Sequence, residues 1–114
     1  MTRKLSEIIL ELAMQGLKHE KYAHSDVVHA LVFLAHVAWN RDTKSPDYLE
    51  NSYRSQLGKF PVSRSAIKRE LITDDWDDIL EKMLNYKKSL FPDDKRIITV
   101  CGYTSRETFR LEWE

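Results

Sequence analysis

The chain has 114 residues with 18 basic and 18 acidic side chains, so its net charge is zero and no global field attracts nucleic acid or an anionic membrane. Hydrophobic residues make up 42% and charged residues 32%, a balance that excludes a disordered chain and suits one compact domain over residues 1–114. The single cysteine, Cys101, excludes an internal disulfide and favours a reducing compartment.

Apolar residues near the N-terminus recur at helical spacing and predict an amphipathic helix over about residues 3–18. Carboxylates at Glu7 and Glu11 interrupt this apolar stretch, whereas a secretory signal has an uninterrupted apolar segment. Together with the lone cysteine, these carboxylates predict a cytoplasmic protein.

The most informative segment is the run VVHALVFLAHVAWN at residues 27–40, fourteen residues without Asp, Glu, Lys or Arg. Because a membrane-spanning helix needs about 20 apolar residues, this run suits a buried helix and predicts no membrane partner. A helix that is apolar nearly all round must be covered on several sides. Ser25 is expected to cap this central helix and Asn40 to end it.

Three further helices are predicted after the central one. Ser, Pro and Asp at residues 45–47 start a helix that ends at Gly58. Ser63 caps a short helix over residues 64–71. Thr73 or Asp74 caps a longer helix that runs to about residue 88.

The C-terminal segment changes character. Residues 97–101 are rich in β-branched side chains, and residues 109–113 alternate apolar and charged side chains, so two strands of a hairpin are predicted. The alternative is a terminal helix, since Thr104 and Glu107 have the spacing of a capping box.

The predicted fold is therefore mostly α (α+β), with four to five helices around the central apolar helix and a C-terminal two-stranded β-hairpin. The core is expected to contain apolar side chains from every one of these elements except the helix that begins at residue 45. They are Leu5, Ile8, Leu12, Val28, Leu31, Phe33, Leu34, Ile67, Leu71, Ile79, Leu80, Val100 and Leu111.

The zero net charge conceals an uneven distribution. Residues 41–72 contain seven basic and four acidic side chains, a net +3, whereas residues 73–94 contain three basic and seven acidic ones, a net −4. The two segments either complement each other inside the fold, which is the preferred interpretation, or present two faces to partners.

Histidines and one aspartate supply the first candidate site. His24, Asp26 and His29 have side chains that bind zinc and lie close together in sequence. His29 and His36 are seven residues apart, about 10.5 Å along a helix, which is too far for one ion. The preferred interpretation is that His29 and His36 lie at the edge of the core and form hydrogen bonds with neighbouring residues. No metal or cofactor is expected.

The second candidate is the segment from Cys101 to Arg106, which follows a predicted strand. It resembles the phosphate loop of the protein tyrosine phosphatases, in which a cysteine thiolate attacks phosphorus and an arginine holds the phosphate oxygens. The resemblance implies Cys101 as the nucleophile and Arg106 as the anion ligand. Four residues separate the two, one fewer than in that family, and Val100 stands where the family has a histidine. An ordinary buried strand cysteine is the preferred interpretation.

Residues 48–71 resemble a helix-turn-helix, in which hydrophobic side chains, here Val62 and Ile67, seat a second helix whose basic residues face DNA. The turn is about three residues longer than the usual pattern, and a basic residue stands where a small one normally allows close packing. The candidate nucleic-acid-binding residues are Arg54, Lys59, Arg64, Lys68 and Arg69.

The twelve aromatic residues exceed what a core of this size needs, so some are expected at the surface, where aromatic residues beside charges are typical of protein interfaces. The candidate partner surface is Tyr48, Tyr53, Phe60, Tyr86, Phe91 and Tyr103. The leading hypothesis is a non-enzymatic cytoplasmic module that binds another protein or itself. A helix-turn-helix DNA-binding protein is the first alternative, and a small phosphate- or metal-handling enzyme is the second.

Overall fold

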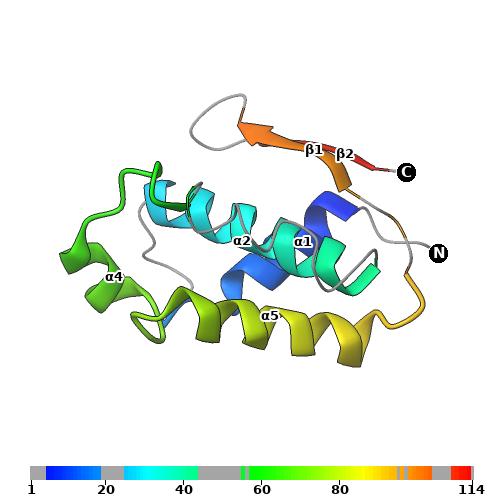
Figure 1. Cartoon of the computed structure of the whole chain (residues 1–114), viewed down its shortest axis with the longest axis horizontal. Helices are drawn as coiled ribbons and strands as arrows, with labels where there is room; N and C mark the ends of the chain where they lie inside the picture. The colour runs from blue at the N-terminus through cyan, green and yellow to red at the C-terminus, as the bar shows by residue number, and fades with distance from the viewer. Residues whose placement is uncertain are drawn as a thin grey trace.

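A computed structural model describes residues 5–18, 25–43, 55, 57–94, 96, 98–103 and 109–113; for the last two ranges it describes the backbone only. Within these ranges four helices are followed by two strands (Figure 1). The elements are α1 (Leu5–Met14), α2 (Ser25–Thr43), α4 (Arg64–Glu70), α5 (Trp76–Leu90), β1 (Ile98–Tyr103) and β2 (Phe109–Trp113).

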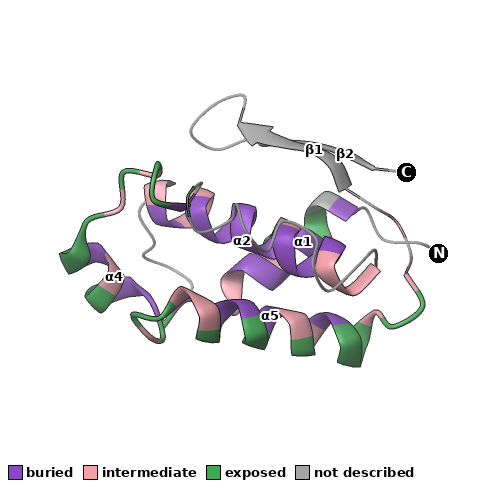
Figure 2. Ribbon diagram, in the orientation of Figure 1, coloured by how far each residue is buried: buried purple, intermediate pink, exposed green. Residues whose placement is uncertain are grey.

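Helix α2 lies at the centre of the molecule, as predicted from its uncharged run. Helices α1 and α5 both pack against α2, and α4 contacts it near the end of the molecule where α5 begins (Figure 1). Figure 2 shows buried residues along most of α2, whereas α5 turns its buried side toward α2 and its exposed side outward. Because burying one large aliphatic side chain contributes about 1.5–3 kcal/mol, the packing of α1 and α5 against α2 stabilises the fold.

The predicted core is largely confirmed. Nine of its members are buried, namely Leu5, Ile8, Leu12, Leu31, Phe33, Leu34, Leu71, Ile79 and Leu80. Val28 and Ile67 are only partly buried and pack against this core. The side chains of Val100 and Leu111 lie outside the described residues.

Three predicted helix ends are wrong. Helix α1 ends at Met14, whereas the sequence predicted a helix that continues to about residue 18. Helix α2 continues three residues beyond Asn40, which is itself fully buried, and reaches Thr43. Helix α5 is capped by Asp75, whose Oδ1 accepts the Asp77 amide at 2.9 Å, in place of Thr73 or Asp74. The predicted cap of α4 is correct, because Ser63 Oγ accepts the Ala66 amide at 3.2 Å. The helix predicted from residue 45 lies mostly outside the described residues.

The turn after α1 requires glycine because it passes close to two other helices. A Cβ atom on Gly16 would lie 2.7 Å from Leu31 Cδ2 and 3.0 Å from Ile79 Cγ2, distances that real Cβ atoms rarely or never show. The carbonyl of Gly16 also accepts the Ile72 amide at 3.0 Å. The absence of a side chain therefore lets the end of α1 hold the segment that leaves α4.

A buried lysine links the C-terminal ends of α2 and α5. Lys87 is fully buried, and its Nζ donates to Asp42 Oδ2 at 2.6 Å and to the Asp94 carbonyl at 3.0 Å. The same ammonium lies 4.7 Å from the ring centroid of Trp39, whose Nε1 donates to the Arg96 carbonyl at 2.6 Å. A hydrogen bond from the Arg96 side chain holds the pKa of Asp94 below its ordinary value. These contacts attach the segment that leads to β1.

The backbone of β1 pairs with β2 in antiparallel register, with Tyr103 opposite Phe109 and Ile98 opposite Trp113. The register shifts between Ile98 and Val100, and β1 lies beside α2 (Figure 1). The strand side chains are outside the described residues, so a stable hairpin with one buried face stays a prediction.

The radius of gyration is 13.2 Å, close to the value of about 13 Å expected for a compact chain of this length. None of the helices in the described ranges is both long and apolar enough to cross a bilayer.

Candidate functional site

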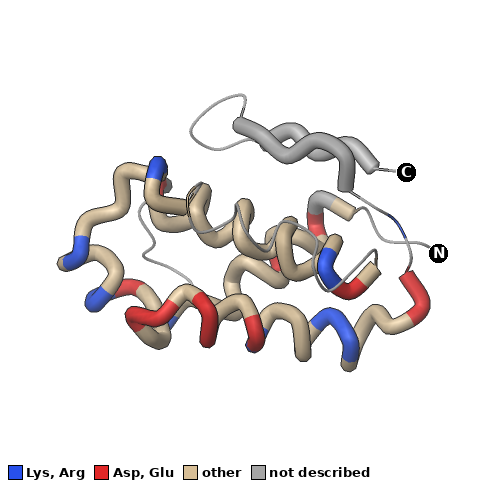
Figure 3. The backbone as a smooth tube through the Cα atoms, viewed as in Figure 1, with Lys and Arg blue, Asp and Glu red and all other residues tan. Residues whose placement is uncertain are grey.

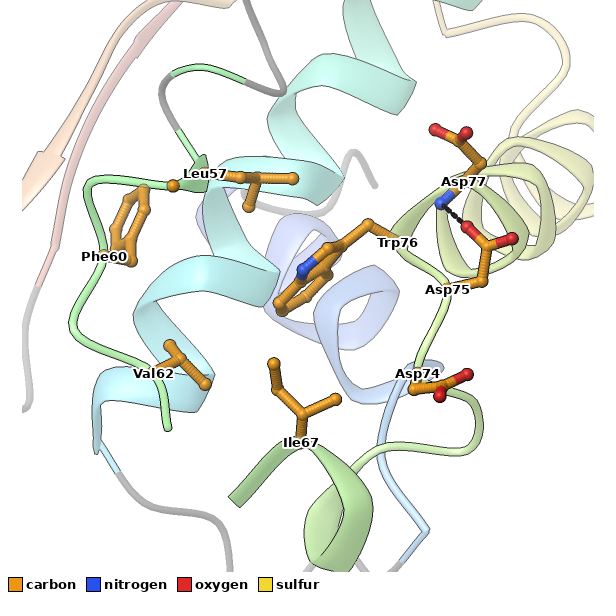
Figure 4. Close-up of a pocket in the computed structure, with 9 residues that line it drawn as sticks. Leu57, Phe60, Val62, Ile67, Asp74, Asp75, Trp76 and Asp77 are labelled. Atoms are coloured by element: carbon orange, nitrogen blue, oxygen red, sulfur yellow. Dashed lines mark hydrogen bonds between the residues drawn. The ribbon is translucent and has the colours of Figure 1, made fainter. Parts of the chain in front are cut away.

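A groove of about 520 Å³ opens between α4 and the N-terminal end of α5 (Figure 4). This volume is within the range of about 300–1,000 Å³ that is typical of ligand pockets. Its apolar wall consists of Leu57, Phe60, Val62, Ile67 and Trp76. Figure 4 shows the Trp76 indole pointing from the start of α5 toward this apolar cluster.

The segment before α4, together with α4 and α5, builds the apolar wall, and the central helix supports it from behind. The ring of Phe60 packs on Phe33 of α2, with 5.7 Å between centroids. The Val62 amide donates to the Phe60 carbonyl at 2.8 Å, and the Ser63 cap then starts α4. Ile67 is half-buried one turn into that helix. The apolar wall of the groove is therefore attached to α2 through Phe60 and to α4 through the Ser63 cap.

Aspartates form one flank of the groove. Asp74, Asp75 and Asp77 line it, and Figure 4 shows their carboxylates turned away from the apolar cluster. The Asp75 side chain caps α5. The positive end of the helix dipole stabilises the four aspartates of residues 74–78, which are called the acidic run below. Asp74 and Asp78 are exposed.

Basic residues form the other flank, on α4. Arg64 and Lys68 line an adjoining cavity of about 380 Å³ together with Ile67 and Asp74. Lys18 adds a cation from the segment after α1, since its Nζ donates to the Lys68 carbonyl at 2.7 Å. Figure 3 shows the basic positions of α4 at one end of the molecule and the acidic run at the start of α5 beside them.

The charges on the two flanks are not paired with each other. Within the described ranges, Arg64 and Lys68 form no ion pair with Asp74 or Asp78, and all four side chains are exposed. The preferred interpretation, that the basic and acidic segments complement each other inside the fold, is not realised by these residues. Their charges are available to a partner.

The predicted nucleic-acid-binding residues gather at the α4 end of the molecule. Lys59, Arg64, Lys68 and Arg69 are all exposed, and Arg69 Nη2 lies 3.6 Å from Glu70 Oε2. The fifth candidate, Arg54, lies outside the described residues.

The described members of the predicted aromatic surface are half-buried. Phe60 lines the groove, whereas the hydroxyl of Tyr86 donates to Glu11 Oε1 at 2.6 Å and Phe91 packs on Trp39. Tyr48, Tyr53 and the side chain of Tyr103 lie outside the described residues. The sequence analysis did not single out Trp76 as a site residue; its position between the aspartates of residues 74–78 was the available signal.

Most of the enzymatic candidate residues lie outside the described part of the chain, so these candidates stay predictions. Asp26 and His29 are half-buried at the start of α2, while His24, Arg106 and the Cys101 side chain lie outside the described residues. In the part of the chain that the structure describes, three or more potential metal ligands nowhere converge.

His36 is the ionisable group of α2 most affected by burial. Its ring lies 5.9 Å from the Phe33 ring, and its Nδ1 has no hydrogen-bond partner among the described residues. Burial lowers the pKa of His36 to about 4, so the ring is neutral near pH 7. An uncharged ring beside Phe33 is compatible with a structural role.

No known protein family matches this chain, and comparisons with curated proteins and with solved structures found no match.

Proposed function

We propose that the chain is a non-enzymatic, cytoplasmic protein-interaction module that docks its partner in the groove between α4 and α5. The observation that supports this proposal most is the combination of an apolar wall containing Trp76 and Phe60 with the exposed charges of Arg64, Lys68 and Asp74 beside it. Protein interfaces typically have an aromatic, desolvated centre and a polar rim.

The two parts of the groove have different tasks in this proposal. The half-buried indole of Trp76 and the side chains around it accept a large apolar side chain and exclude water from it. The charges of Arg64 and Asp74 at the rim orient the partner and raise its association rate, while adding little affinity.

Peptides selected from a random display library on the wild-type protein are expected to carry a large apolar side chain and to bind in the groove. The substitution Val62→Glu places a carboxylate in the apolar wall that also contains Trp76 and is expected to weaken their binding at least tenfold, or about 1.4 kcal/mol. Titration followed by tryptophan fluorescence measures this change.

The matched control is Leu90→Glu, because Leu90 is 55% exposed and lies at the opposite end of α5. The control variant should bind the peptides as the wild type does. Peptides that bind equally well to the Val62→Glu and wild-type proteins would rule out the groove as the docking site.

A second candidate function, helix-turn-helix DNA binding, is favoured by one observation: the exposed basic side chains of α4 lie beside Lys18. About three phosphate contacts predict roughly 40-fold weaker binding at about 200 mM than at about 50 mM salt. Fluorescence anisotropy of a labelled duplex should show this loss, and also show weaker binding by the double variant Arg64→Glu, Lys68→Glu. A protein that leaves the anisotropy unchanged at the lower salt concentration is not a phosphate-contacting DNA binder.

A further inference from the structure

We propose that the partner docked in the groove is a second copy of this chain, related to the first by a two-fold axis. This inference rests on the proposed function and specifies its partner. In the resulting dimer the basic face of α4 from one copy lies against the acidic start of α5 from the other.

The charge pattern around the groove is self-complementary. Basic residues lie at the α4 end, and the acidic run lies beside them at the start of α5 (Figure 3). A two-fold rotation about an axis between them brings Arg64 and Lys68 of each copy opposite Asp74 and Asp78 of the other. A partner with a single sign of charge would satisfy only one flank and be repelled by the other.

Each copy has side chains ready for these contacts. Arg64, Lys68, Asp74 and Asp78 are exposed and unpaired within the described part of the chain, so pairing between copies breaks no ion pair there. The net charge of zero means that two copies approach each other without overall repulsion.

The apolar groove lies where the basic and acidic flanks meet, close to the proposed axis. Two-fold docking therefore places the half-buried Trp76 and Ile67 of both copies near the centre of the interface. A standard interface covers about 800 Å² per copy, roughly a ninth of the surface of 7033 Å². The contact must therefore extend from the groove onto the outer faces of α4 and α5.

A charge-swap experiment tests this arrangement by sedimentation equilibrium at low salt. The basic-flank variant carries Arg64→Glu and Lys68→Glu, and the acidic-flank variant carries Asp74→Lys and Asp78→Lys. Each is expected to self-associate at least tenfold more weakly than the wild type, because like charges then face each other in both halves of the dimer. An equimolar mixture of the two variants should recover dimers, since opposite charges face each other again.

The matched control is Lys88→Glu, which reverses an exposed charge near the C-terminal end of α5 and should leave the dimer intact. Circular dichroism of each variant checks that it is folded. A wild-type protein that stays monomeric up to roughly 1 mM overturns the inference. Dimerisation of both flank variants like the wild type, or a mixture that does not recover dimers, also overturns it.

The two proposals fail in distinguishable ways. If the wild type is monomeric but selected peptides still bind with a dependence on Val62, the docking groove stands and only its assignment to a second copy is wrong. If neither peptide binding nor self-association depends on the groove, the proposed function and the assignment to a second copy are both wrong. DNA binding is also distinguishable from dimerisation, because the acidic-flank variant should bind a duplex more tightly than the wild type but form fewer dimers.

Discussion

Replacing Asp42 with alanine is expected to lower the free energy of unfolding by about 3–5 kcal/mol, the range for removing one partner of a buried ion pair. The Lys87 ammonium is fully buried, and the Asp42 carboxylate is its closest acceptor at 2.6 Å. Without that carboxylate, the groups of the described residues that still interact with the charge are the Asp94 carbonyl, the face of the Trp39 ring and, at longer range, the Asp94 carboxylate. Urea unfolding monitored by circular dichroism measures the change.

Substitution of the other partner of the ion pair, Lys87→Met, is expected to destabilise the protein less than Asp42→Ala. It removes the buried charge and keeps most of the side-chain volume, while Asp42, which is 15% exposed, retains some access to water. Lys88→Met, at the exposed neighbouring position, is the matched control and should leave stability almost unchanged. A loss below about 1 kcal/mol for Asp42→Ala would contradict a buried ion pair as the link between α2 and α5.

Acidification is expected to destabilise the protein through His36. Burial lowers the pKa of His36 from its ordinary value of 6.5 to about 4 in the folded protein. Above pH 6.5 the ring is neutral in both states and contributes nothing to the pH dependence. As the pH falls from 6.5 toward 4, only the unfolded chain binds the proton, so His36 removes at most about 3 kcal/mol of stability.

The variant His36→Leu tests this assignment, because it keeps an apolar contact with Phe33 and cannot be protonated. Urea unfolding of the variant between pH 7 and 4 should show a shallower loss of stability than the wild type. His29→Gln removes a histidine from the same helix and is the matched control, in which the His36 contribution remains. An unchanged pH dependence in His36→Leu would show that the loss arises elsewhere.

The buried ion pair and the groove lie at opposite ends of α5. Lys87 is near its C-terminal end, whereas Trp76 is its first residue. Substitutions this far apart, without shared partners, usually act independently. We therefore expect Asp42→Ala to change stability without changing association while the protein stays folded. Both charge-flank variants should weaken association, and the acidic-flank variant should also lose some stability, because it places lysines at the positive end of the α5 dipole.

The amino-acid sequence was sufficient to predict the central helix and the helices beside it. A run of fourteen residues without a charged side chain has few options other than burial, and its partners show the 3.6-residue period of helices with one buried face. The cap at Ser63 was predictable because it is local: the Ser63 hydroxyl accepts a hydrogen bond from the amide only three residues away.

Features that depend on residues far apart in the chain were not predictable. Helix α2 passes Asn40 and includes Asp42, which pairs with Lys87, 45 residues later. A lysine beside exposed residues on α5 has no local sign of burial. The groove likewise exists only because Phe60 reaches Phe33 and α4 is brought beside Trp76.

Whether a feature was predictable from the sequence depends on the distance along the chain over which its interactions act. Periodicity and capping act over a few residues and can be read from local order along the chain. Buried ion pairs, grooves and charged flanks are formed by side chains that meet only after the helices pack, because packing brings together residues that are remote in sequence.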